Sequence, residues 1–185
     1  MLEPRIQQHF VDSADLAYQS AQVLGPAIES AVQALVAGIT SGAKVLVCAS
    51  PQSHALAERF ALLCVTSFER ERPALAALAL GSHAICARQI HALGQPGDVL
   101  LVVSAQPANE ALCDAVQAAH EREMTVVALL GAGSDALLAQ LRETDVPICV
   151  AHERAARVHE IHTIVVHCLC DGVDLQLLGE QENFQ

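Results

Sequence analysis

Short apolar segments that alternate with amphipathic helical segments are the feature that most limits how this chain can fold. After residue 43, runs rich in Val, Leu and Ile predict strands at 45–48, 75–80, 99–103, 125–130 and 146–150. Helical patterns follow them at 53–68, 84–93, 107–121, 135–142 and 153–178. Strands that are apolar on both sides and alternate with helices are typical of a parallel sheet covered on both faces. We therefore predict an α/β fold, a three-layer αβα sandwich with a five-stranded parallel sheet.

The first 42 residues precede this alternation and are predicted to form a pair of helices. The two helices cover 6–24 and 27–39, where apolar residues recur every three or four positions. Gly25-Pro26 predicts a break between them, because proline lacks an N–H group and clashes with the preceding turn. The chain is thus one domain, 1–185, with a helical pair at 1–42 and the αβα core at 43–185. Surplus apolar faces on the N-terminal helices and on the long last helix indicate a subunit interface.

Charge and composition narrow the range of partners. Ten Lys and Arg residues stand against twenty-one Asp and Glu, for a net charge of −11. No basic stripe is present to neutralise phosphates, so we expect no direct nucleic-acid binding. The apolar runs are far shorter than the roughly 20 residues of a membrane span, and the N-terminus has no apolar signal segment. With seven scattered cysteines, an odd number, the chain is expected to be cytoplasmic and not membrane-bound.

Two loops are the candidates for a ligand-binding site. Ala49-Ser-Pro-Gln-Ser53 follows the first predicted strand, and Ser104-Ala-Gln-Pro-Ala-Asn109 follows the third. Each loop also precedes a predicted helix. Ligands of open parallel sheets bind at the carboxyl ends of strands, which is where both loops lie.

Several stretches resemble the sugar isomerase (SIS) domain family. They are residues 68–73, 92–101, 123–129 and 159–171, the last of which ends in Cys168-Leu-Cys-Asp171. The chain is most similar to the branch that holds the phosphoheptose isomerases and DiaA, a protein that binds the replication initiator DnaA. The resemblance covers nearly the whole chain. It implies the same five-stranded sandwich, assembled as a homotetramer or a dimer, with no cofactor.

The phosphate-binding loops of that family differ from the loops of this chain. Where the family has Gly-Asn-Gly-Gly-Ser, only Ser53 is kept, and where it has Ser-Thr-Ser-Gly-Asn-Ser, only Ser104 is kept. Each loop has a proline in place of a glycine, which removes an N–H donor. Ser53 and Ser104 can alternatively be helix N-caps. The resemblance implies a remnant sugar-phosphate pocket formed by Ser53, Ser104, Gln106 and Asn109.

The catalytic positions of the family are also altered. Two glutamates in the helix after the first loop correspond to Leu62 and Leu63, and leucine cannot accept a proton. The family's glutamine and histidine on the last helix correspond to His159 and His167, which remain candidates as bases or ligands. Arg59 and Leu63 stand where metal-binding relatives have ligands. We therefore expect no metal site.

These departures favour a non-catalytic scaffold similar to DiaA, which would bind DnaA and promote its assembly at the replication origin. Leu177 and Leu178 correspond to an apolar pair that contacts DnaA in that protein, although they can equally pack within the oligomer. Two alternatives remain. One is a phosphoheptose isomerase that acts on sedoheptulose 7-phosphate with His159 or His167 as base, and the other is a module that binds a sugar phosphate without turnover.

Overall fold

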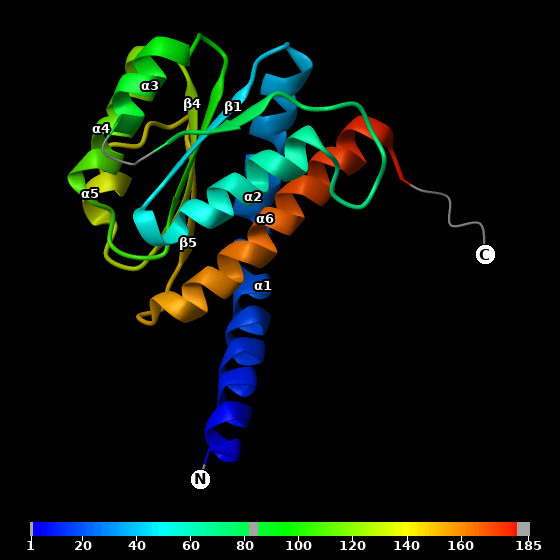
Figure 1. Ribbon diagram of the computed structural model, residues 1–185, viewed down its shortest axis with the longest axis vertical. Coiled ribbons are helices and arrows are strands. Elements are labelled where there is room, and N and C mark those ends of the chain that lie inside the picture. Colours follow the sequence, from blue (N-terminus) through cyan, green and yellow to red (C-terminus); the bar gives the residue numbers. More distant parts are fainter. Residues whose placement is uncertain (1, 82–84, 181–185) are drawn as a thin grey trace.

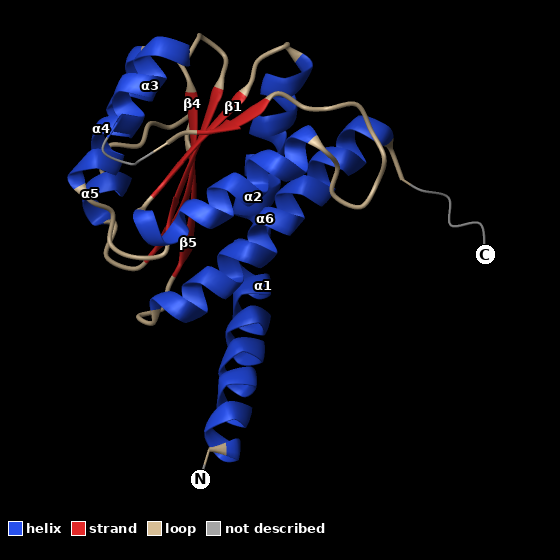
Figure 2. Ribbon diagram, viewed as in Figure 1, coloured by secondary structure: helices blue, strands red, loops and turns tan. Residues whose placement is uncertain are grey.

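Five parallel strands form one sheet in the computed structural model, which describes residues 2–81 and 85–180. The order across the sheet is β2-β1-β3-β4-β5. Figure 2 shows the strands in red between the helices. The strands are β1 (Val45–Ala49), β2 (Ala77–Ala79), β3 (Val99–Ser104), β4 (Thr125–Gly131) and β5 (Val146–Val150). The predicted αβα sandwich with a five-stranded parallel sheet is confirmed.

Helices cover both faces of the sheet (Figure 1). One layer consists of α1 (Glu3–Thr40), α2 (His54–Val65) and α6 (Ala155–Leu178), and the other of α3 (Cys86–Leu93), α4 (Glu110–Glu121) and α5 (Asp135–Leu138). Side chains of a strand alternate between the faces, so Val45 and Val47 pack under the first layer and Leu46 and Cys48 under the second. Both faces are therefore buried, as the doubly apolar strands predicted.

The N-terminal helical pair was a wrong prediction, because α1 runs without a break through Pro26. Proline removes the hydrogen bond to the carbonyl of Gln22, but Gln22, Gly25 and Pro26 are all exposed, so water can satisfy that group. Packing of the later turns against the sheet and α6 then keeps the helix continuous. Leu24, Val32 and Leu35 are buried in that contact.

Other element boundaries differ by a few residues from the prediction. The second strand is confined to Ala77–Ala79, and α4 begins at Glu110 rather than at 107. The predicted helix 84–93 starts at a residue outside the described part of the chain, and its described portion is α3. These differences leave the sequence of strands and helices unchanged.

The strand order places the carboxyl ends of β1 and β3 at a topological switch point. The chain passes from β1 outward to β2, and then returns to the other side of β1 to form β3. In open parallel sheets, ligands bind in the crevice at such a point, outside the carboxyl ends of the strands. The two loops singled out in the sequence follow these two strands.

Two helices, α1 and α6, are long and apolar enough to cross a membrane when judged by length and composition alone. Both pack on the sheet and on each other in this fold. A buried core helix meets the same criterion as a membrane span. Their apolar character is thus accounted for in part by the core, although much of the first half of α1 is exposed.

Candidate functional site

Hydrogen bonds tie the two loops together at the switch point. The Ser50 N–H donates to the Val103 carbonyl at 3.0 Å, and the Ala105 N–H donates to Ser53 Oγ at 3.2 Å. Ser50 Oγ lies 3.2 Å from Ser53 Oγ. Ser53 is almost fully buried, and its hydroxyl joins the loop after β1 to the loop after β3. Ser53 occupies the N-cap position of α2, as one interpretation of the sequence expected, but its side chain makes no capping hydrogen bond.

The loop after β3 is shaped by its own polar groups. Ser104 is buried at the end of β3, and its hydroxyl donates to the Gln106 carbonyl at 2.8 Å. The N-cap of α4 is Asn109, whose Oδ1 accepts from the Leu112 N–H at 3.1 Å. The N-cap interpretation of Ser104 is therefore wrong. The side chains of Gln106 and Asn109 are exposed beside the α4 N-terminus.

Two further residues of this edge were missed in the sequence, where 131–133 was interpreted only as a turn. Ser134 Oγ accepts from the Ala108 N–H at 3.3 Å, which links the turn after β4 to the same loop. A Cβ atom on Gly131 would lie 2.7 Å from the Ala105 carbonyl oxygen and 3.2 Å from Val158 Cγ1. Glycine thus permits the close approach that brings α6 to the carboxyl edge of the sheet.

The structure separates the two histidines that the sequence proposed as bases. His159 follows Val158, the α6 residue that packs on Gly131, and is half-buried near the edge. His167 lies eight residues later, about 12 Å along the helix axis. Its ring packs on Phe68 with centroids 5.2 Å apart, and its Nε2 is buried without a hydrogen-bond partner among the described residues. Burial lowers the pKa of His159, which favours the neutral imidazole that can accept a proton.

A third histidine, His162, is fully buried on the same helix. The Leu130 carbonyl at the end of β4 faces its ring, but neither ring nitrogen forms a well-aligned hydrogen bond. Burial lowers the pKa of His162 to about 4. The imidazole is therefore neutral in the folded protein at pH 7, and it is a structural group rather than an exposed ligand.

We expect His162 to make stability depend on pH. Because its folded pKa is about 4 and its ordinary value is 6.5, the unfolded state binds the extra proton between these values. The contribution of neutral His162 to the free energy of unfolding is fully present above pH 6.5 and is lost as the pH falls. The free energy of unfolding should therefore decrease by about 2–3 kcal/mol from pH 7 to pH 4.5. Urea unfolding at both pH values measures it. His162→Leu should reduce the pH dependence by that amount, whereas His91→Gln, at an exposed site, should not.

The leucines at the family's carboxylate positions lie on α2 with different exposure. Leu63 is 8% exposed and packs in the core, and Leu62 is 56% exposed. Three aspartates are buried among the described residues, and all are engaged elsewhere. Asp98 pairs with Lys44 Nζ at 2.6 Å, Asp145 pairs with His120 at 2.7 Å, and Asp174 pairs with Arg72. The described part of the chain therefore places no buried carboxylate at the switch point.

The described residues contain no group of three or more His, Cys, Asp and Glu side chains arranged to hold a metal ion. The groups that the carboxyl edge does bring together are hydroxyls, backbone N–H groups, amides and an imidazole. Such groups can bind an anion and transfer a proton.

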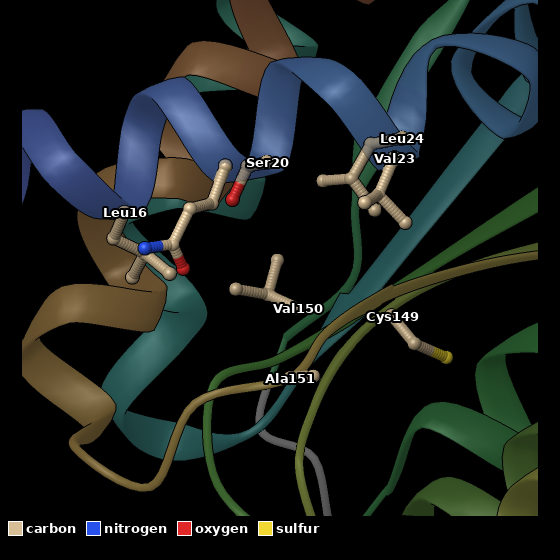
Figure 3. A pocket seen from close by; sticks show the side chains of 8 residues that line it. Leu16, Ser20, Val23, Leu24, Cys149, Val150 and Ala151 are labelled. Atoms are coloured by element: carbon tan, nitrogen blue, oxygen red, sulfur yellow. The ribbon is translucent and has the colours of Figure 1, made fainter.

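A separate hollow lies between α1 and the end of β5 (Figure 3). Adjacent strand residues point in opposite directions there, Val150 toward α1 and Cys149 away from it. The remaining lining is Leu16, Gln19, Ser20, Val23, Leu24 and Ala151. With no charged side chain in its wall, this hollow is poorly suited to a phosphorylated ligand. The carboxyl edge at the switch point remains the candidate site.

The leucine pair at the end of α6 is divided between core and surface. Leu177 is partly buried and packs on the core, whereas Leu178 is exposed near the end of the helix. Asp174, one turn earlier, is buried in an ion pair. Only part of this tail is therefore available for contact with another molecule.

Comparison with known proteins identifies relatives over almost the full length. The model of the SIS domain matches residues 9–131. A phosphoheptose isomerase of Methylibium petroleiphilum is 51% identical, over 98% of each chain, and one of Thiobacillus denitrificans is 43% identical, over 98% of this chain and 99% of the relative. The solved phosphoheptose isomerase of Francisella tularensis is 35% identical with a TM-score of 0.88, over 94% of this chain and 98% of that one.

These relatives correct the expected function. A non-catalytic scaffold that binds DnaA was the main expectation, but relatives at 38–51% identity along nearly the whole chain are named phosphoheptose isomerases. A second solved structure, from Neisseria gonorrhoeae, has the same name, with 33% identity and a TM-score of 0.84 over 94% of this chain and 99% of that one. The DnaA assignment of Leu177 and Leu178 loses its basis. By sequence and by fold, the chain belongs to the SIS domain family.

Proposed function

We propose that this chain is a phosphoheptose isomerase that interconverts sedoheptulose 7-phosphate and the corresponding aldoheptose 7-phosphate. The observation that carries the proposal is the 51% identity, over 98% of both chains, with a relative of that name. The switch-point location of the polar loops supports it, because that crevice is where such sheets bind ligands.

The phosphate would be held at the loop after β3. Gln106 and Asn109 are exposed there and can donate from their amide groups, and the α4 N-terminus favours an anion. Ser53 and Ser104 are buried and bonded to the two loops, so their part in the pocket is to shape these loops. Pro51 and Pro107 remove N–H donors from the loops, so we expect the phosphate to be bound with fewer hydrogen bonds than a glycine-rich loop provides.

His159 is the proposed base. Its neutral imidazole would remove a proton from C1 of the ketose to give an enediolate with its charge on O2. The hydroxyl proton of O1 would pass to O2, and the imidazolium would return its proton to C2 to give the aldose with its carbonyl at C1. Leu62 and Leu63 cannot take this role. His167 is the alternative base, but it lies about 12 Å further along α6.

Exchange in deuterated water tests the proposal directly. Purified protein with millimolar sedoheptulose 7-phosphate should replace a C1 proton by deuterium and produce the aldose anomeric signal in the proton NMR spectrum. A catalyst of this reaction exchanges the proton even when little aldose accumulates. Neither exchange nor product over a day at micromolar protein would refute isomerase activity.

Leu62 and Leu63 favour a second candidate, a domain that binds a sugar phosphate without turnover. A ligand that binds only the folded state raises thermal stability. An increase in Tm with sedoheptulose 7-phosphate, without deuterium exchange, would support this candidate over the isomerase.

We also propose that the chain works in the cytoplasm as a homotetramer or a dimer. None of the seven cysteines, all of which lie in the described part of the chain, forms a disulfide, which suits a reducing compartment. Exposed apolar side chains on α1 and α6 support self-association.

A further inference from the structure

Four of the seven cysteines are buried, and their thiols meet in two pairs, one on each face of the sheet. Cys48 of β1 is hydrogen-bonded to Cys86 of α3 under one helical layer. Cys64 of α2 is hydrogen-bonded to Cys170 of α6 in the other layer. The two members of each pair lie far apart in the sequence, so a disulfide at either place would link two separate elements of the fold.

The second pair lies beside the buried ion pair of Arg72 and Asp174. Cys170 is four residues before Asp174 on α6, so their side chains share one face of that helix. Arg72 donates to Asp174, and its Nη1 also donates to the Cys64 carbonyl at 2.7 Å. The guanidinium thus holds the last turn of α2 against the face of α6 that carries Cys170. Figure 1 shows the two helices side by side.

The surroundings of this pair divide the two thiols into an attacking and a resolving group. The hydrogen bond from Cys170 and the positive charge of Arg72 lower the pKa of Cys64, against the effects of burial and of the Asp174 carboxylate. The same hydrogen bond and burial raise the pKa of Cys170. Oxidation of a thiol begins at the thiolate, and a neighbouring thiol then converts the sulfenic acid into a disulfide. Cys64 is suited to the first step and Cys170 to the second.

We propose that Cys64 and Cys170 form a redox-active dithiol, which a small hydroperoxide oxidises to a disulfide between α2 and α6. The Cys64 thiolate attacks one oxygen of hydrogen peroxide, and the O–O bond breaks. The hydroxide that leaves takes up the proton that the thiol had released. The Cys170 thiol then attacks the sulfur of the Cys64 sulfenic acid, so that the S–S bond forms and a second water leaves. Two electrons pass from the thiols to one peroxide, which becomes two waters.

The burial of the pair selects a small oxidant. Cys64 and Cys170 are 5% and 3% exposed, which excludes a bulky oxidant such as glutathione disulfide from the folded chain. The irregular segment 66–76 follows α2 and lies against its last turn. It is held there by Arg72 and by the Leu75 N–H, which donates to the Cys64 carbonyl at 3.0 Å. Local opening of this segment would expose Cys64 while the sheet remains folded.

The pair on the other face of the sheet is a built-in control. Cys48 is fully buried on β1, between β2 and β3, and Cys86 is fully buried at the start of α3. The Cys86 thiol and burial raise the pKa of Cys48. The pKa of Cys86 is lowered, but by the hydrogen bond with Cys48 and not by a cation. We therefore expect this pair to remain reduced under conditions that oxidise Cys64 and Cys170.

The intact mass of the full chain after oxidation is the first test. The variant Cys149→Ser/Cys168→Ser removes the two exposed thiols and serves as the background. After treatment with a roughly tenfold excess of hydrogen peroxide, it should lose about 2 Da, the two hydrogens of a dithiol, and regain them with dithiothreitol. A protein whose mass is unchanged after an hour of treatment would overturn the proposal.

Peptide mapping identifies which thiols are linked. Trypsin cleaves after Arg and Lys, so it should release residues 60–70 joined to residues 158–185, and each of these peptides contains one cysteine of the background variant that belongs to the proposed pair. A link between Cys48 and Cys86, alone or to the same extent, would overturn the proposal, because oxidation would then follow opening of the whole fold.

Paired substitutions in the same background separate the two sites. Cys64→Ala/Cys170→Ala should abolish the mass loss, and the matched Cys48→Ala/Cys86→Ala should retain it. Oxidation should raise the Tm of the background by about 5–10 °C, because the disulfide restrains the unfolded chain, and should not raise the Tm of Cys64→Ala/Cys170→Ala. If either paired variant fails to fold, the peptide map of the background still decides. Oxidation by glutathione disulfide as fast as by hydrogen peroxide would overturn the assignment of a small oxidant. All of these readouts are independent of isomerase activity.

Discussion

Asp174→Ala is expected to lower the free energy of unfolding by about 3–5 kcal/mol, because it leaves a buried guanidinium without its counter-charge. Arg72 and Asp174 are 2% and 1% exposed in their side chains, and Arg72 Nε donates to Asp174 Oδ1. The other nitrogens of Arg72 donate to the carbonyls of Cys64 at 2.7 Å and Leu63 at 2.9 Å. These carbonyls belong to the last turn of α2, where no N–H group of the helix is available to bond to them. One ion pair thus joins α2, the segment before β2 and α6.

Denaturant unfolding at fixed protein concentration measures this loss, since an oligomer's stability depends on concentration. Asp171→Ala is the matched control. It removes an exposed aspartate one turn earlier on the same helix and should change stability by no more than about 0.5 kcal/mol. A loss below 1 kcal/mol for Asp174→Ala would show that the guanidinium is hydrated in solution and that the pair does not hold α2 to α6.

The sheet could be predicted from the sequence because its signal is local. The central strands β1, β3 and β4 are short apolar runs with both faces buried, and each helix has its own period. The third strand and the helix after it were therefore predicted, at 99–103 and 107–121, without knowledge of their neighbours. The switch-point loops followed from the same pattern. The continuous α1 could not be predicted this way, since Pro26 is tolerated only because its surroundings are exposed and the later turns are packed.

Contacts between segments that lie far apart in the chain could not be predicted from the sequence. Nothing near Arg72 indicates that it will meet Asp174, 102 positions later. In that tail only Leu177 and Leu178 were assigned a role, as a partner contact or as packing within the oligomer. Ser53 was interpreted as a cap because serine favours that position, but its hydroxyl bonds to Ala105 on the neighbouring loop. The function was misjudged for another reason. Two leucines and two prolines in the loops and α2 were given more weight than similarity along the whole chain.

His159→Asn should lower kcat/KM for sedoheptulose 7-phosphate by about 100- to 10,000-fold, the usual contribution of a general base. Asparagine keeps a polar side chain of similar size but cannot accept the proton. Because burial lowers the pKa of His159 below 6.5, the wild-type rate should stay level from pH 8 to pH 6.5 and fall below that range, as the imidazole becomes protonated. Stopped assays of aldoheptose 7-phosphate across this range measure both effects.

The His167→Asn variant decides which of the two histidines is the base. His167 packs on Phe68 some two turns further along α6, and its loss should lower kcat/KM by less than tenfold if His159 alone moves the proton. The reverse ranking would place the base at His167 and overturn the role of His159. A loss from His159→Asn that leaves the acid limb of the pH profile unchanged would indicate a positioning role, because loss of the base must remove its own contribution to that limb. The substrate phosphate, whose second pKa is about 6, contributes the rest.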